Sequence, residues 1–222
     1  MLLLSKVKTY AQLCGVAKAL DVVGGRWTLL IVRNLLVGAQ RYTELLDTLP
    51  GITTNLLAER LQHMQAAGLI TTRRTAGPAQ ATVYELTPRG LELEPVVLAL
   101  GSFGAPYLAA PKRGDRRHVR WAMVSIKRRF VPEKLKRSIR LQFVVGGSHH
   151  YALHGDRNGL RVQEAELQTP DARVELDEAA FIGLMFRGEP ARALRAKNEL
   201  SVTGDESAVT AFLAAVSDVR LD

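Results

Sequence analysis

The chain of 222 residues contains one cysteine, Cys14, and few aromatic residues, which make up 6% of the sequence. A single cysteine excludes a disulfide framework and a cysteine-rich zinc module. No apolar run approaches the roughly 18 residues that a membrane helix requires, and the apolar start at residues 2–4 is too short for a signal peptide. We therefore expect a soluble, cytoplasmic protein without a membrane partner, whose core consists of Leu, Val, Ala and Ile.

Sequence motifs of enzymes are also missing. The chain has no P-loop and no Rossmann glycine pattern, and Glu164 and Glu166 have no recognisable nucleophile or acid–base partner. His149, His150 and His154 cluster, but the first two would point to opposite faces of a strand, which disfavours a metal site. We expect no catalytic residues, no cofactor and no bound metal.

Positive charge is concentrated in the middle of the chain. The net charge of +8 divides into +3 for residues 1–110, +10 for residues 111–145 and −5 for residues 146–222. A basic front and middle predict a polyanionic partner, although a solvated basic surface gives the same composition. The basic segment 112–140 could contact that polyanion or meet the acidic part of the same chain or of a second copy, and the sequence leaves both open.

The first part of the chain has helical periodicity. Apolar spacing and capping residues predict helices at 16–23, 27–36, 43–49 and 53–68. Val16, Leu20 and Val23 share one face of the first helix. The third and fourth helices flank a tight turn at Pro50-Gly51, and two short helices joined in this way form a helix-turn-helix arrangement.

A basic two-stranded hairpin follows these helices. Its predicted strands are 69–74 and 82–86, around a tip at Gly77-Pro78. Helices followed by such a hairpin make a winged helix. The amphipathic helix predicted at 91–103 lies outside this unit and could pair with a second copy of the chain.

The rest of the chain is predicted to be α+β. The expected strands are 139–145, 160–167, 172–176 and 199–203. The expected helices run from Asp177 to Phe186, from Pro190 to Lys197 and from Asp205 to Val219. They form a small, mainly antiparallel sheet with helices on one face. Because Pro and Gly cluster between residues 101 and 114, we expect an N-terminal domain at 1–104, a linker at 105–115 and a C-terminal domain at 116–222.

Five segments of the front half resemble one family. They are CGVAKALDVVGGRWTLLI at 14–31, PGI at 50–52, NLLAERL at 55–61, AGLI at 67–70 and YELTPRG at 84–90. In this order they resemble the HxlR-type family of bacterial transcription regulators, over roughly residues 10–104. The resemblance implies a homodimeric winged-helix protein that binds double-stranded DNA through its N-terminal domain.

Polar residues of the fourth helix are the candidate base readers. With Leu57, Leu61 and Met64 turned inward, the outward face consists of Thr53, Thr54, Asn55, Ala58, Glu59 and Gln62. A phosphate contact is expected at Arg41 and Thr43, which open the third helix. Arg73 and Arg74 on the wing are expected to make phosphate or minor-groove contacts. Arg60 borders the apolar face, so it makes either a phosphate contact or a structural ion pair. A solvated polar face is the alternative for all of these residues.

Cys14 occupies the position of a cysteine seen across the HxlR-type family, and the resemblance implies a redox candidate, since some members sense oxidants there. A reactive thiol must be exposed and have a lowered pKa. Lys18, one turn further on, could lower the pKa, but Leu13 and Val16 indicate a partly buried site. A small packing residue is therefore the alternative.

The rear half, from about 116 to 219, is similar to the sterol carrier protein domain. The matching stretches are PDARVELD at 170–177, FIGLMFRG at 181–188 and ELSVTGD at 199–205. The resemblance implies an apolar tunnel for a hydrophobic ligand. Its candidate lining is Trp121, Phe130, Phe181, Ile182, Met185, Phe186, Leu194 and Phe212. The same residues could simply form the core.

These features combine into one expected function. We expect a homodimeric transcription regulator, a repressor, that binds palindromic operator DNA and senses a hydrophobic small-molecule effector through its C-terminal domain. The rival hypothesis is a carrier of lipids or other hydrophobic ligands, in which the N-terminal half serves mainly for dimerisation.

Overall fold

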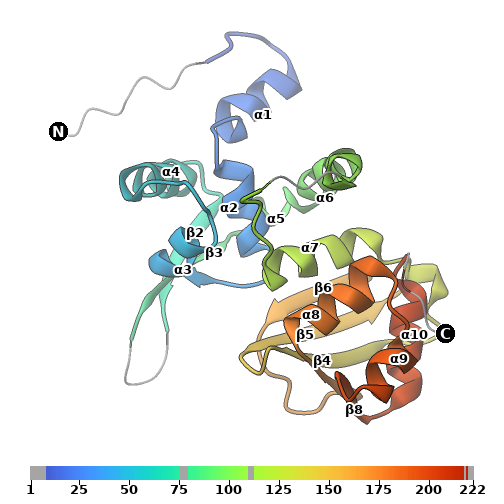
Figure 1. Cartoon of the computed structure of the whole chain (residues 1–222). Helices are drawn as coiled ribbons and strands as arrows, with labels where there is room; N and C mark the ends of the chain where they lie inside the picture. The colour runs from blue at the N-terminus through green and yellow to red at the C-terminus, as the bar shows by residue number, and fades with distance from the viewer. Residues whose placement is uncertain (1–8, 76–79, 110–112, 218, 220–222) are drawn as a thin grey trace. The chain divides into compact units, whose positions relative to one another are not determined.

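The computed structural model describes residues 9–75, 80–109, 113–217 and 219. The chain divides into two compact units, Met1–Val97 and Leu98–Asp222, which are described separately (Figure 1). The division falls within a helix, and the linker at 105–115 stays a prediction. Among the described residues, no helix is both long and apolar enough to cross a membrane.

The first unit is a winged helix-turn-helix. Its helices are α1 (Gly15–Val23), α2 (Thr28–Leu35), α3 (Tyr42–Asp47), α4 (Thr54–Ala66) and α5 (Pro88–Leu91), with α6 (Glu94–Gly104) continuing into the second unit. Its strands are β1 (Gln40–Arg41), β2 (Ile70–Arg74) and β3 (Thr82–Leu86), paired antiparallel in the order β1-β3-β2. The helix expected at 91–103 is α6, which begins three residues later than predicted, at Glu94, after the separate short helix α5. The predicted wing tip at Gly77-Pro78 lies outside the described residues.

A series of buried hydrogen bonds links α2 to α3. The Asn34 side-chain amide donates to Thr48 Oγ1 at 2.7 Å, and the Thr48 hydroxyl donates to the Glu44 carbonyl at 2.7 Å. Arg33 donates to the Asn34 side-chain oxygen at 3.0 Å. Burial lowers the pKa of Arg33 to about 10, so the guanidinium stays charged near neutral pH. Because buried polar groups without partners are costly, this network fixes how the two helices pack.

The second unit is α+β, as expected. Its helical segments are η1 (Ala105–Ala109), α7 (Val119–Arg129), η2 (Pro132–Lys134), α8 (Glu178–Ile182), the π-helical turn η3 (Gly183–Arg187), α9 (Ala191–Ala196) and α10 (Glu206–Ala215). Its strands are β4 (Ile139–Val145), β5 (His149–Asp156), β6 (Gly159–Glu164), β7 (Ala172–Leu176) and β8 (Leu200–Gly204). They are ordered β6-β5-β4-β7-β8, and only the β4–β7 pair is parallel.

Three expectations for this unit are corrected. The helix expected from Asp205 to Val219 ends at Ala215, because Val216 has an extended backbone. The sheet has five strands in place of the expected four, because residues 149–156 form β5. The helix expected from Asp177 to Phe186 ends at Ile182 and continues as the π-helical turn. Asp177 is its N-cap, as predicted, since its carboxylate accepts the Ala180 N–H at 2.7 Å.

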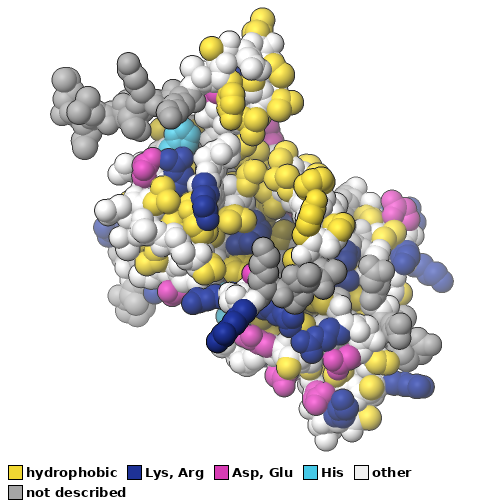
Figure 2. All heavy atoms as spheres, turned by 45° about the horizontal axis from the view of Figure 1, so that its top comes forward, with side chains coloured by type: hydrophobic (Ala, Val, Ile, Leu, Met, Phe, Trp, Pro, Cys, Tyr) yellow, Lys and Arg dark blue, Asp and Glu magenta, His cyan; other side chains and the backbone are white. Residues whose placement is uncertain are grey.

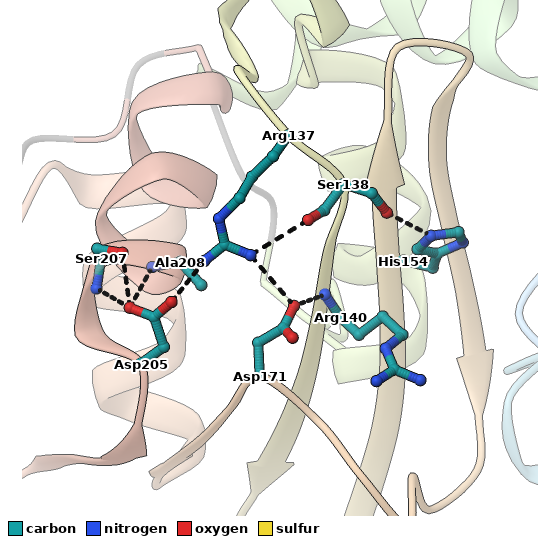
Figure 3. A network of polar contacts seen from close by, with 8 residues as sticks. All are labelled: Arg137, Ser138, Arg140, His154, Asp171, Asp205, Ser207 and Ala208. Atoms are coloured by element: carbon teal, nitrogen blue, oxygen red, sulfur yellow. Dashed lines mark hydrogen bonds and ion pairs between the residues drawn. The ribbon is translucent and has the colours of Figure 1, made fainter.

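An exposed ionic network joins three elements of the second unit (Figure 3). The Arg137 guanidinium pairs with Asp205, the N-cap of α10, and lies 3.8 Å from the Asp171 carboxylate. Asp171 accepts the Arg140 N–H at 2.6 Å, and its carbonyl accepts the Asp205 N–H at 2.8 Å. The start of β4, the residue before β7 and the start of α10 are thereby held together.

Asp205→Asn is expected to lower the thermal unfolding midpoint near neutral pH. The pKa of Asp205 lies below its ordinary value because the Ser207 hydroxyl, the backbone N–H groups of Ser207 and Ala208 and the charge of Arg137 stabilise the carboxylate. A lowered folded-state pKa adds stability above the ordinary pKa, and this stability is lost as the pH falls through the lower value. Asparagine retains a capping oxygen but not the charge.

The midpoints of wild type and Asp205→Asn should therefore converge as the pH falls below about 4. Calorimetry across this range checks the prediction. Glu199→Gln is the matched control, because it removes an exposed carboxylate for which the structure records no hydrogen bond or ion pair with a described residue. Identical midpoints for Asp205→Asn and wild type near neutral pH would contradict the assigned role.

Candidate nucleic-acid interface

The turn between α3 and α4 is built by specific residues. Gly51 has φ +91°, a left-handed conformation that glycine adopts without strain. Thr53 is the N-cap of α4, since its hydroxyl accepts the Leu56 N–H at 3.3 Å. The Tyr42 hydroxyl donates to the Thr54 carbonyl at 2.6 Å and so links α3 to the first turn of α4. These contacts fix the orientation of the helix that carries the candidate base readers.

The inward face of α4 is the predicted one. Leu57, Leu61 and Met64 are buried. The exposed members of the predicted outward face are Thr53, Thr54, Asn55, Glu59 and Gln62, while Ala58 is half-buried. The first two turns of α4 therefore present hydroxyl, amide and carboxylate groups to the surface, and their contact with DNA bases stays a prediction.

Arg60 differs from the exposed polar residues of α4. Its guanidinium pairs with Glu59, and its side chain is 20% exposed. It packs against Gly25, where any Cβ would collide with the guanidinium. Of the two roles expected for Arg60, the structure therefore shows the ion pair. The phosphate contact stays a prediction.

The start of α3 is exposed but already capped. Arg41 and Thr43 lie at the surface, as a phosphate contact requires. However, the Glu44 carboxylate accepts the Arg41 N–H at 2.7 Å. That amide is therefore not available to a phosphate, and the negative charge of Glu44 opposes one. A phosphate contact here would have to come from the Arg41 guanidinium, the Thr43 hydroxyl or another amide of the first turn.

The two wing arginines are not equivalent. Arg73 Nε donates to the Glu85 carboxylate at 2.6 Å, across from β2 to β3. Arg74 makes only a long hydrogen bond, 3.4 Å, to the side chain of Gln80. Both are exposed. Because Arg74 has no ion pair with a described residue, it is the better placed of the two to contact a phosphate.

Exposed apolar side chains lie on two helices. Of the three residues predicted to share one face of α1, Val23 is buried, whereas Val16 and Leu20 are exposed. On α6, Val96, Leu100 and Phe103 are exposed, and their spacing places them on one face. Hydrophobic side chains at the α1 end are visible in Figure 2. The face that Val16, Leu20 and Val23 share is therefore only partly covered in the single chain.

Cys14 lies at the N-cap of α1 and is exposed. The backbone N–H groups of Ala17 and Val16, at the start of α1, lower the pKa of its thiol. The expectation of a partly buried site is wrong, because Leu13 and Val16 are themselves exposed and do not cover the thiol. Exposure and a lowered pKa are the two properties that a reactive cysteine needs.

The predicted lining of the hydrophobic site is mostly core. Phe130, Phe181, Met185, Leu194 and Phe212 are buried. Phe130 and Phe212 stack with ring centres 6.3 Å apart.

Three of the predicted lining residues are less enclosed. Trp121 and Ile182 are half-buried and Phe186 is exposed. Phe186 lies under the Arg129 guanidinium, 4.6 Å from it. Whether any of the predicted lining residues touches a ligand stays a prediction.

A hollow of about 540 Å³ lies elsewhere in this unit. It is lined by Val144, Gly146, Gly147, Arg173, Glu175, Leu176, Asp177, Asn198, Glu199 and Ser201. None of these residues belongs to the predicted apolar set. No group of three or more His, Cys, Asp or Glu residues within the described ranges is placed to hold a metal ion.

Comparison with known proteins supports the resemblance of the N-terminal half of the chain to the HxlR-type family. A model of the family described as HxlR-like helix-turn-helix matches residues 22–112. The chain is 32% identical over 97 residues to the uncharacterized HTH-type transcriptional regulator sll1512 of Synechocystis sp., which covers 44% of this chain and 72% of that protein. It is 34% identical over 97 residues to the uncharacterized HTH-type transcriptional regulator Rv3095 of Mycobacterium tuberculosis, covering 44% of this chain and 61% of that protein.

A solved structure, that of the redox regulator HypR in its reduced form, is 28% identical and covers 43% of this chain and 94% of its own, with a TM-score of 0.40. The wing and the α3–turn–α4 geometry define a winged helix-turn-helix protein of the DNA-binding class. The chain belongs to the HxlR-like helix-turn-helix family of transcription regulators.

Proposed function

We propose that this protein is a homodimeric repressor that binds palindromic operator DNA through α4. The observation that carries the proposal is the exposed polar face at the start of α4, backed by the buried row of Leu57, Leu61 and Met64. Recognition helices of helix-turn-helix proteins place their N-terminal residues against base edges in the major groove. An asparagine there can bind adenine through two hydrogen bonds, and a threonine can hydrogen-bond to a base edge or contact the thymine methyl group.

The exposed apolar faces of α1 and α6 support a homodimer. Val16 and Leu20 on α1, and Leu100 and Phe103 on α6, are exposed to solvent within the described part of the chain. Phe103 is 73% exposed. Large apolar side chains grouped on one helix face mark interaction surfaces, and a second copy of the same chain buries both faces through a two-fold axis.

Footprinting of the DNA upstream of the coding region tests the operator proposal. We expect two protected half-sites whose centres are separated by about one helical turn, roughly 10 bp, or a multiple of it. Protection of a single half-site would contradict the palindromic dimer. Uniform weak protection would contradict sequence-specific binding.

We further propose that the second unit senses a hydrophobic small molecule through a sterol carrier protein-like domain. The supporting observation is an aromatic group formed by Phe130 at the C-cap of α7, Phe143 on β4 and Phe212 on α10. The ring centre of Phe212 lies 6.3 Å from that of Phe130 and 5.6 Å from that of Phe143. Titration with a fluorescent long-chain fatty acid tests this. Saturable binding that changes DNA affinity supports a sensor, binding without any DNA affinity supports the rival carrier, and no binding contradicts both.

Cys14 is proposed as a redox-sensitive residue of the same regulator. Because its thiol pKa is lowered by the amides of α1, the folded protein should hold more thiolate than an ordinary cysteine near neutral pH. Iodoacetamide should therefore alkylate the folded protein faster than the urea-unfolded chain, in which the helix is absent, and the difference should vanish well above the ordinary thiol pKa. Equal rates in both states near neutral pH would contradict the proposal.

A further inference from the structure

The basic residues of the middle of the chain fall into two groups. The first group is held inside the second unit. Arg120 is 2% exposed and pairs with Glu164. Arg129 donates to the carbonyls of Ser217 at 2.8 Å and Met185 at 2.6 Å. With Arg137, which pairs with Asp171 and Asp205, these arginines stabilise the fold and are not free to bind a partner.

The second group is free. Arg113, Arg116 and Arg117 are exposed, and no hydrogen bond or ion pair joins their side chains to another described residue. They lie in a stretch that begins with a turn, where Gly114 has φ +99°, and continues to α7 without helix or strand. Asp115 is the only acidic residue among them. Three positive charges thus stand on a short exposed segment that the fold does not otherwise use.

Several acidic residues of the same unit are already paired with other arginines. Glu164, Asp171 and Asp205 are already paired with the arginines of the first group. On β7, Arg173 pairs with Glu166 and Glu175. Because like charges crowded on a surface disfavour the isolated protein and attract a polyanion, a partner outside the chain is the better match for the free group.

We propose that Arg113, Arg116 and Arg117 form an arm that binds the phosphate backbone of the DNA to which α4 binds. This inference rests on the proposed DNA-binding function and extends it to residues beyond the winged helix. Guanidinium groups pair with phosphate oxygens through two hydrogen bonds. Such contacts add affinity and salt dependence without adding base preference. The arm therefore strengthens binding to operator and to unrelated DNA alike.

The salt dependence of DNA affinity tests the arm. The full-length triple variant Arg113→Gln, Arg116→Gln, Arg117→Gln is compared with the control Lys134→Gln, Lys136→Gln, Arg140→Gln. The control removes the same charge from exposed residues whose side chains have no hydrogen bond or ion pair with a described residue. Each phosphate contact contributes about 0.9 to the slope of log affinity against log salt, so the arm variant should lose up to about 2.7 per chain. Between about 0.05 M and 0.20 M salt, wild-type affinity should then fall about 40-fold more per chain than that of the arm variant.

Each outcome decides the question. A reduced slope in the arm variant only, with the preference for operator over scrambled DNA retained, supports the arm. An unchanged slope in the arm variant, or an equal reduction in both variants, overturns the arm while leaving the proposed function in place. If the wild type binds no duplex DNA, the proposed function fails and the arm fails with it. Circular dichroism of both variants confirms that the fold is intact.

Discussion

Replacing Thr54 and Asn55 by alanine is expected to abolish sequence-specific DNA binding while the protein remains folded and dimeric. Both side chains are exposed in the first turn of α4, so their removal leaves no cavity. A bidentate contact to a base discriminates by about 1–3 kcal/mol, which is roughly 5- to 150-fold per half-site. Because a homodimer contacts two half-sites, it loses this base discrimination at both of them. The measurement is the ratio of affinities for operator and scrambled duplex.

Gln65→Ala is the matched control, because Gln65 is exposed near the opposite end of α4. It should leave the ratio unchanged, and both proteins should elute as the wild type does in size-exclusion chromatography. If the double variant keeps its preference for the operator, α4 is not the reading helix.

Leu100→Glu is expected to convert the proposed dimer into a monomer. Leu100 lies between Val96 and Phe103 on the exposed apolar face of α6. In a two-fold symmetric interface the substitution places a charge on both copies, and juxtaposed like charges cost several kcal/mol. Dimerisation should weaken by about 100-fold or more, which analytical ultracentrifugation measures directly.

Ser102→Glu is the control for this substitution. Ser102 is exposed on α6 and its hydroxyl donates to the Leu98 carbonyl. The same charge there should leave the dimer intact. If Leu100→Glu sediments as the wild type does, the exposed face of α6 is not the dimer interface.

The elements of the winged helix-turn-helix that were predicted correctly follow from the local spacing of apolar residues. The 4-and-3 spacing of Leu57, Leu61 and Met64 defines a buried face in any compact unit, and Thr53 supplies the capping oxygen. These signals depend only on neighbours in sequence. The helix-turn-helix and both wing strands could therefore be predicted from the order of the residues alone.

The errors come from features that distant residues decide. Val16 and Leu20 have the spacing of a buried face, but periodicity does not say whether that face is covered by the same chain or by another. The strand β5 was missed because Gly155 occupies an inward position where an apolar side chain would mark the alternation; there a Cβ would approach Phe130 and Leu135 to 3.1 Å. Arg60 packs against Gly25, which lies in another part of the sequence, so this contact could not be deduced from α4 alone, whereas its ion pair with Glu59 was one of the two expected roles.

The residues of the candidate site could be predicted from the sequence, but the charged partners of those residues could not. The sequence identified the polar face of α4 and the basic wing. It did not show that Glu44 caps the start of α3 or that Arg73 pairs with Glu85. Both acids reduce the positive charge available to DNA, and both are found only once β-strand register and helix capping are known.

Fluorescence anisotropy of labelled DNA from the region upstream of the coding sequence tests the central claim most directly. It should be measured near physiological salt with excess non-specific competitor DNA, because non-specific binding is electrostatic and is removed under these conditions. We predict saturable binding that survives the competitor. Binding that disappears with competitor would contradict a sequence-specific regulator and would favour a carrier of hydrophobic ligands.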